Sequence, residues 1–137
     1  MIRLTRRYEF PAAHVLCRPS FSDAQNVRVY GKCANPNGHG HDYGVEVTVE
    51  GPFDPLDGRI VDPDLLDCLF EEVVGSRLAH RMLNEDAWFR DLVPTAENIA
   101  RVIHRELEGP VEGRTTARVT AVRVVETRKN SFVHGEI

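Results

Sequence analysis

Apolar and polar residues alternate in two stretches of the chain. From residue 2 to residue 10 every second side chain is apolar, with one exception, and Pro11 follows. From residue 43 to residue 50 the alternation is more regular, and it stops at Gly51. A period of two places successive side chains on opposite faces of a β-strand. We therefore predict a first strand that Pro11 closes and a second strand from residue 43 to residue 50.

Two later stretches have the spacing of amphipathic helices. Asp62 followed by Pro63 is typical of a helix start. The aspartate carboxylate can cap the first turn, and proline fits the first helical position because the backbone N–H that it lacks has no partner there in a helix. Apolar residues then recur at every fourth position until about Leu78. A second helix is expected to begin at Thr95, which can cap it in the same way. A Gly-Pro pair that starts at Gly109 is expected to end it.

The remaining stretches complete an α+β pattern. Residues 116–126 are rich in β-branched side chains but shift parity midway, which predicts a third strand with either a bulge or burial on both faces. Residues 131–136 predict a short last strand. Residues 18–38 have no sustained period and contain several prolines and glycines, so we expect a long loop with short strand pieces near residues 27–30. The order β-β-α-α-β-β predicts an antiparallel sheet with both helices on one face and with oligomerisation covering the other.

The composition limits the class of protein. A chain of 137 residues, 42% of them hydrophobic and 28% charged, has the size and balance of one globular domain, which we place over residues 1–137. With 17 basic and 21 acidic side chains the net charge is −4, which argues against nucleic acid as a partner. No apolar run approaches the roughly 18 residues of a membrane span, and we find no signal peptide. Three cysteines without a CxxC pair favour a reducing compartment, so we expect a cytoplasmic protein.

Histidines gather just before the second predicted strand. His39 and His41 flank Gly40, and residues two apart on an extended chain project from the same face. Both imidazoles can bind one zinc ion, and His14, just past the first strand, can supply a third nitrogen. Three protein ligands leave one position open, which is typical of a catalytic zinc rather than a structural one. The alternative is that these are surface histidines on a glycine-rich loop.

Three further residues can carry chemistry. Cys33 lies six residues before His39, where a metal could lower its pKa and make it a general base; otherwise it is a small buried residue. His80 follows the first helix and could transfer a proton, or it could be a histidine that the helix dipole favours. Glu126 closes the third strand, where its carboxylate could accept two N–H bonds from an aminopyrimidinone or could simply be solvated.

Five strings together resemble one known family. They are FPAAH at 10–14, GKCANPNGHGHDY at 31–43, GRIVD at 58–62, PTAEN at 94–98 and VET at 125–127. In this order they are similar to the family of 6-pyruvoyltetrahydropterin synthase and 6-carboxytetrahydropterin synthase, over nearly the whole chain. The resemblance implies a tunnelling fold, in which three protomers close a β-barrel and two trimers stack into a homohexamer. It also implies active sites between protomers.

The resemblance also implies roles for individual residues. The zinc ligands fall on His14, His39 and His41, the general base on Cys33, the catalytic histidine on His80, and the substrate-binding residues on Glu126, Thr95 and Glu97. The implied substrate is 7,8-dihydroneopterin triphosphate, whose side-chain hydroxyls zinc holds while the cysteine removes a proton and triphosphate is eliminated. The product is 6-pyruvoyltetrahydropterin. A triphosphate substrate also leaves room for Mg²⁺.

One departure from the family pattern keeps alternatives open. The family usually has an aspartate just before the catalytic histidine, whereas this chain has Ala79. Asp42, Glu85 or Asp86 could substitute for it, the reaction could tolerate its loss, or the protein could be a pterin-binding protein with weakened catalysis. A second alternative is the 6-carboxytetrahydropterin synthase of the deazapurine (queuosine) pathway, which uses the same substrate. The six-residue spacing from Cys33 to the next histidine favours the pyruvoyl-forming branch.

Overall fold

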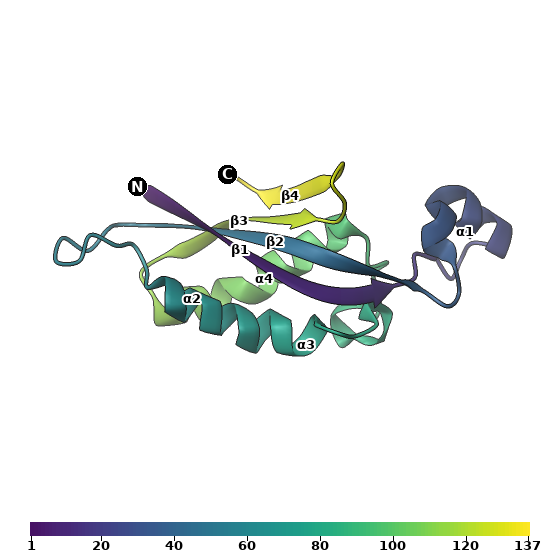
Figure 1. Cartoon of the computed structure of the whole chain (residues 1–137), viewed down its shortest axis with the longest axis horizontal. Helices are drawn as coiled ribbons and strands as arrows, with labels where there is room; N and C mark the ends of the chain where they lie inside the picture. The colour runs from purple at the N-terminus through teal and green to yellow at the C-terminus, as the bar shows by residue number, and fades with distance from the viewer.

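Four antiparallel strands form one sheet, in the order β1-β2-β3-β4 (Figure 1). This computed structural model describes residues 1–137. The strands are β1 (Ile2–His14), β2 (His39–Gly51), β3 (Arg118–Val125) and β4 (Ser131–Gly135). Their order along the chain and their antiparallel pairing are as predicted.

Both long strands extend further than their alternation predicted. β1 continues through Pro11, so the prediction that proline closes it is wrong. The carbonyl of Pro11 accepts a hydrogen bond from the His80 amide, which shows that its backbone faces away from β2, at the edge of the sheet. A missing N–H costs no ladder bond on that side. β2 begins at His39 rather than at residue 43, which places His39 and His41 within the strand.

The helices pack on one face of the sheet (Figure 1). They are α2 (Pro63–Phe70), the π-helical turn η2 (Glu71–Gly75), α3 (Ser76–Leu78) and α4 (Ala96–Arg114). Asp62 and Thr95 cap α2 and α4 as predicted, each accepting a hydrogen bond from a backbone amide of the first turn. The connection between α3 and α4 holds two short 3₁₀ turns, η3 (Leu83–Glu85) and η4 (Ala87–Phe89). None of the helices has both the length and the apolar character that a membrane crossing requires.

The core lies between this layer and the sheet. Its fully buried members include Tyr43, Val45, Val47 and Val49 of β2 and Leu66, Leu69, Ile99, Ile103 and Leu107 of the helices. The predicted end of α4 at Gly109 is wrong, because the helix continues through Pro110. Val111, one turn beyond Leu107, is completely buried and prolongs the apolar stripe. Thr115 then ends the helix, and its hydroxyl donates a hydrogen bond to the Val111 carbonyl.

The predicted long loop between the first two strands contains a helix. This helix, α1 (Asp23–Tyr30), lies apart from the sheet and leads into the 3₁₀ turn η1 (Gly31–Ala34) (Figure 1). The prediction of strand pieces near residues 27–30 is therefore wrong. Ser22 and Gln25 form a capping box, and Asn26 is the helix's single buried residue. A helix with so little apolar surface has no periodic signal to detect.

The sheet face away from the helices is lined by polar side chains. Glu50 accepts hydrogen bonds from Arg3 at 3.2 Å and from Arg118 at 2.7 Å, and Thr5 and Thr48 form a further hydrogen bond. The register shifts after Thr48, which confirms the predicted bulge where β3 pairs with β2. This face therefore satisfies its charges within one chain instead of exposing an apolar layer.

Candidate active site

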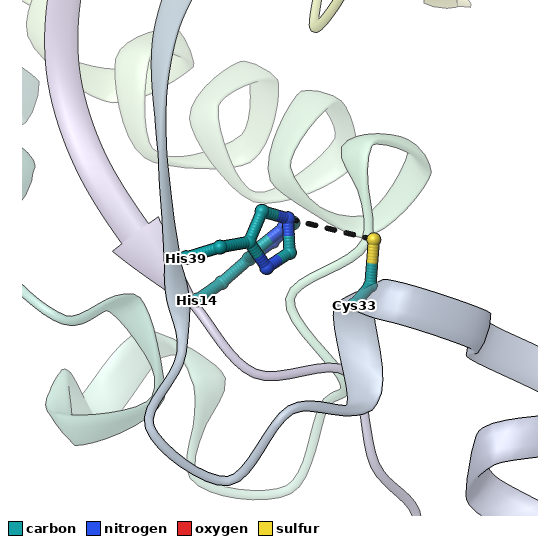
Figure 2. A group of neighbouring side chains, drawn as sticks. All are labelled: His14, Cys33 and His39. Atoms are coloured by element: carbon teal, nitrogen blue, oxygen red, sulfur yellow. Dashed lines mark hydrogen bonds between the residues drawn. The ribbon is translucent and has the colours of Figure 1, made fainter.

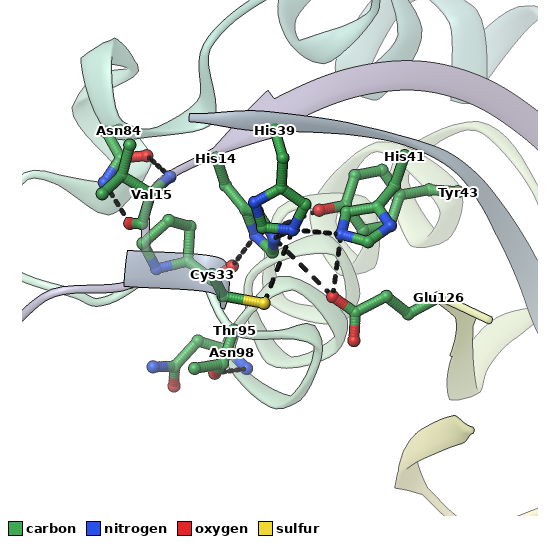
Figure 3. Close-up of polar contacts among 11 residues, drawn as sticks. His14, Val15, Cys33, His39, His41, Tyr43, Asn84, Thr95, Asn98 and Glu126 are labelled. Atoms are coloured by element: carbon green, nitrogen blue, oxygen red, sulfur yellow. Dashed lines mark hydrogen bonds and ion pairs between the residues drawn. The ribbon is translucent and has the colours of Figure 1, made fainter. Parts of the chain in front are cut away.

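Three imidazoles meet where β1 and β2 pair at one end of the sheet. The register sets His14 directly opposite His39, and the period of two brings His41 to the same face. Nε2 of His39 lies 3.1 Å from Nε2 of His14 and 2.7 Å from Nε2 of His41 (Figure 3). The three side chains singled out as metal ligands thus present nitrogens to one point.

The orientation of His14 is set by its second ring nitrogen. Nδ1 of this fully buried side chain lies 2.9 Å from the carbonyl of Pro94 and 3.1 Å from the hydroxyl of Tyr43. A carbonyl only accepts, so we assign the proton to Nδ1, which leaves the lone pair of Nε2 facing the cluster. Sequence analysis gave Tyr43 no role in the site. Its place two residues after His41, on the same face of β2, is the signal that could have identified it.

A thiol and a carboxylate border the imidazoles on two sides. Sγ of Cys33, on η1, lies 3.5 Å from Nε2 of His39 (Figure 2). Oε1 of Glu126, directly after β3, lies 3.4 Å from Nε2 of His41 and 3.7 Å from Nε2 of His14 (Figure 3). Segments far apart in the sequence therefore deliver their functional groups to the same place.

Backbone contacts hold these segments together. The amide of Leu16 donates to the carbonyl of Cys33 at 2.7 Å, which ties η1 to the chain just beyond β1. Asn84 forms two hydrogen bonds with the backbone of Val15, both 2.8 Å long. The chain that follows His14 is thereby fixed on both sides, and Cys33 is fixed with it.

Burial shifts the pKa of four groups in the cluster. It lowers the pKa of His14 to about 4, with the neighbouring imidazoles adding to the effect, and it lowers the pKa of His39 as well. Burial also raises the pKa of the Cys33 thiol, which the Glu126 carboxylate raises further. The pKa of Glu126 rises through burial and through Glu97, against the effect of His41. Near pH 7 the imidazoles of His14 and His39 are therefore neutral, and their lone pairs are available.

These donors fit a bound metal ion. Two neutral imidazole nitrogens 2.7 Å apart cannot both direct lone pairs at one another without a proton or a cation between them. The ligand atoms of His14, Cys33 and His39 lie within 4.8 Å of one another, as do those of His14, His41 and Glu126. Nδ1 of His39 is the single buried side-chain nitrogen or oxygen without a hydrogen-bond partner. Imidazole nitrogens with a nearby thiol are the donors that zinc prefers.

The structure does not bring His80 to this cluster. Its side chain is exposed in the turn after α3 and makes no hydrogen bond or ion pair. None of Asp42, Glu85 and Asp86 pairs with it, and Asp86 instead accepts hydrogen bonds from Arg77 at 2.9 Å. The position of the usual aspartate, Ala79, therefore has no substitute within this chain.

The two residues of the PTAEN string occupy different places. The hydroxyl of Thr95 accepts a hydrogen bond from the Asn98 amide at 3.3 Å and so caps α4. Glu97 is exposed, and its charge acts on Glu126. The Thr95 hydroxyl is thus engaged in the cap of α4, whereas the Glu97 carboxylate is exposed to solvent.

An α+β sheet that ends in three converging imidazoles, a thiol and a carboxylate has the architecture of an enzyme with a metal-binding site. Residues 3–136 match the family model described as 6-pyruvoyl tetrahydropterin synthase. The 6-pyruvoyl tetrahydrobiopterin synthase of Poecilia reticulata is 41% identical over 133 residues, which are 96% of this chain and 88% of that protein. That of Homo sapiens is 38% identical over 96% of this chain and 90% of its own.

A solved structure agrees with the sequence relatives. Caenorhabditis elegans 6-pyruvoyl tetrahydropterin synthase superposes with a TM-score of 0.89 and 33% identity, over 99% of this chain and 96% of that one. The chain belongs to the 6-pyruvoyl tetrahydropterin synthase family, and it is an enzyme of the carbon–oxygen lyase type. The resemblance found in the sequence is thereby confirmed.

Proposed function

We propose that the protein is a zinc-dependent lyase that eliminates triphosphate from 7,8-dihydroneopterin triphosphate and forms 6-pyruvoyltetrahydropterin. The observation that carries the proposal is the convergence of three imidazoles, with Sγ of Cys33 3.5 Å from Nε2 of His39. This arrangement sets a general base beside the place of a Lewis acid. The names of the relatives at 38–41% identity favour the pyruvoyl product over the carboxy product.

Under this proposal His14, His39 and His41 hold the zinc. Bound there, the ion would polarise the side-chain hydroxyls of the substrate and make the adjacent C–H bond more acidic. The hydrogen bond from Nδ1 of His14 to the Pro94 carbonyl keeps the first ligand in its binding tautomer. The hydroxyl of Tyr43, 3.1 Å away, restrains the same ring.

Cys33 and Glu126 have separate roles, in proton transfer and in binding the pterin. The thiolate of Cys33 takes the proton from the substrate carbon, and the elimination of triphosphate follows. Oε1 of Glu126 faces the imidazoles, while its second oxygen is free to accept N–H bonds from the pterin edge. Glu97, whose charge raises the pKa of Glu126, stays a predicted substrate contact. Thr95 stays a predicted substrate contact.

Positive charge for the triphosphate is available beside two of these residues. Arg128 and Lys129 lie exposed in the turn that follows Glu126, and the exposed Lys32 directly precedes Cys33. We propose that these basic side chains contact the phosphates, because each set is next in sequence to a residue of the site. Mg²⁺ on the triphosphate and a cytoplasmic location stay predictions.

We propose that His80 acts in the site of a neighbouring protomer. It lies outside the cluster of its own chain, and the predicted homohexamer sets active sites between protomers. The edges of the sheet offer the contacts, since residues 3–9 of β1 form no backbone hydrogen bond on their outer side and β4 is the opposite edge. Inactive Cys33→Ala and His80→Ala chains should regain activity when they are co-assembled. A lack of regain, with assembly demonstrated, would contradict shared sites.

A second function is favoured by one observation. Ala79 stands where the family usually has an aspartate, and no other carboxylate pairs with His80. A histidine without its orienting partner transfers protons less efficiently. The protein would then bind pterins tightly and turn them over slowly.

The release of triphosphate tests the proposed function. Zinc-loaded protein is incubated with 7,8-dihydroneopterin triphosphate, and free triphosphate is measured by ion chromatography. Release is expected from the wild type and from the control Cys68→Ala, whose thiol lies exposed on α2, but not from Cys33→Ala. Tight binding without release by the wild type would contradict the proposed reaction and support the pterin-binding function.

A further inference from the structure

The Cys33 thiol lies beside a metal-binding nitrogen as well as beside the place of the substrate. Building on the proposed function, we propose that the Cys33 thiolate is the fourth ligand of the ion in the substrate-free enzyme. Substrate displaces this ligand, and the displacement frees the thiolate as the base. The Cys33 side chain would thus fill the fourth coordination position of the ion until the substrate binds.

The distance from the Cys33 sulfur to the His39 nitrogen is the one expected between two ligands of the same zinc ion. The sulfur lies 3.5 Å from Nε2 of His39, and it belongs to a group with His14 and His39 whose ligand atoms are all within 4.8 Å. A thiolate and an imidazole bound to one tetrahedral zinc, at about 2.3 Å and about 2.0–2.1 Å, are about 3.5 Å apart. Figure 2 shows the Cys33 sulfur pointing toward both rings, and the hydrogen bond from Leu16 to the Cys33 carbonyl holds it there.

The sulfur also lies against the central nitrogen of the cluster. Nε2 of His39 is the atom that His14 and His41 approach to 3.1 and 2.7 Å. The competing donor, Glu126, contacts only the two outer imidazoles, at 3.4 and 3.7 Å. A thiolate is in addition a softer donor than a carboxylate, which suits zinc. These contacts favour Cys33 as the ligand and leave Glu126 for the substrate.

The charges around the sulfur point the same way. No lysine or arginine side chain pairs with Cys33 or Glu126, and Glu126 itself adds an acid to the cluster. A thiolate needs a nearby positive charge. An ion held by the imidazoles would supply that charge next to the sulfur itself, which lies 3.5 Å from Nε2 of His39.

The exchange of ligands balances chemically. The thiol loses its proton to solvent when the sulfur binds the ion. A hydroxyl of the substrate then contributes its own lone pair in place of the sulfur, and the thiolate leaves with the pair that it donated. This pair takes the proton of the substrate carbon, so that an S–H bond forms as a C–H bond breaks. The electron pair of the C–H bond stays on the substrate, from which triphosphate leaves.

Cobalt in place of zinc gives a readout that does not depend on turnover. Thiolate-to-cobalt charge transfer absorbs in the near ultraviolet, whereas imidazole and carboxylate ligands produce no such band. Cobalt-loaded wild type and Cys17→Ala should show the band, and Cys33→Ala should lack it with cobalt still bound. Cys33→Ser serves in its place if the alanine variant does not retain the metal. The band should disappear when 7,8-dihydroneopterin, which has the hydroxyls but no triphosphate, is added to the wild type.

The outcomes separate this proposal from the proposed function. A wild type with bound cobalt and no band, or a band that persists in Cys33→Ala, overturns Cys33 as a ligand. A band that survives saturation with dihydroneopterin overturns the displacement. A cobalt spectrum without the band that changes in Glu126→Gln identifies the carboxylate as the fourth ligand instead. Triphosphate release is measured on the zinc form of each protein. If the wild type releases triphosphate but its cobalt form lacks the band, only the assignment of Cys33 as a ligand is refuted. If the wild type has the band but releases no triphosphate, only the proposed reaction is refuted.

Discussion

The backbone of His80 leads to a quantitative prediction. It is the one non-glycine residue with a positive φ, 62°, and two backbone hydrogen bonds hold its turn on the edge of β1. The His80 amide donates to the Pro11 carbonyl at 2.6 Å, and the Ala13 amide donates to the Arg81 carbonyl at 2.9 Å. A left-handed conformation costs a residue with a Cβ about 1–2 kcal/mol. We infer that the fold bears this cost because the turn presents the imidazole to the site of a neighbouring protomer, as proposed above.

The perturbation is a pair of substitutions, His80→Gly and His80→Ala. Both remove the imidazole, but only glycine relieves the strain. The relief of about 1–2 kcal/mol is offset by about 0.5–1 kcal/mol of extra chain entropy in the unfolded state. His80→Gly should therefore be more stable than His80→Ala by about 1 kcal/mol, or about 3–4 °C in Tm for a chain of this length. Urea and thermal unfolding at one protomer concentration measure the difference.

Ala79 supplies the matched control. It precedes His80 but has an ordinary extended backbone, with φ −64° and ψ 134°. Ala79→Gly should destabilise the protein by about 0.5–1 kcal/mol, opposite in sign to the effect at the next residue. Equal stability of His80→Gly and His80→Ala, or greater stability of the alanine variant, would refute the strain. Both His80 variants should also lose activity, because neither can transfer a proton.

Three further predictions concern the chemistry and the acid stability of the protein. Cys33→Ala should lower kcat by about 10²–10⁴-fold while zinc stays bound, as metal analysis of the purified variant checks; unchanged turnover contradicts its role as the base. Ala79→Asp should raise kcat by about tenfold or more and Ala79→Asn should raise it less; no gain shows that the missing carboxylate does not limit the reaction. Arg6, through its hydrogen bonds, keeps the pKa of Asp67 below its ordinary value of 3.8. The stability that this carboxylate contributes is therefore complete above pH 3.8, and it is lost as the pH falls through the lower pKa of the folded state. The stability difference between wild type and Asp67→Asn, measured by urea unfolding, should accordingly shrink in acid, and a difference that does not change with pH refutes the linkage.

The sheet and the two long helices could be predicted because their signals are local. Alternation reveals a half-buried strand, and a capping side chain such as Asp62 or Thr95 marks a helix start whatever surrounds it. The errors fall where tertiary context decides. Pro11 is tolerated because its backbone faces away from β2, where no ladder N–H is needed, and α4 passes Pro110 because Val111 has a place in the core. Neither fact is visible in the sequence of the segment itself.

The site was predictable in its residue types more than in its geometry. His39 and His41 share a face by strand periodicity, and the opposition of His14 to His39 follows once β1 and β2 pair. The contact of His14 with the Pro94 carbonyl has no sequence signal, because every residue carries a carbonyl. The distance of His80 from the cluster was equally hidden, since it depends on how the turn after α3 packs on β1.

The mass of the product tests the central proposal most directly. Zinc-loaded protein and 7,8-dihydroneopterin triphosphate are incubated without oxygen, and the pterin is identified by mass spectrometry. We predict the mass of 6-pyruvoyltetrahydropterin together with released triphosphate. A 6-carboxytetrahydropterin mass, with its side chain lost as acetaldehyde, would assign the chain to the other branch of the chemistry. Unchanged substrate bound to the protein would contradict the proposed lyase activity.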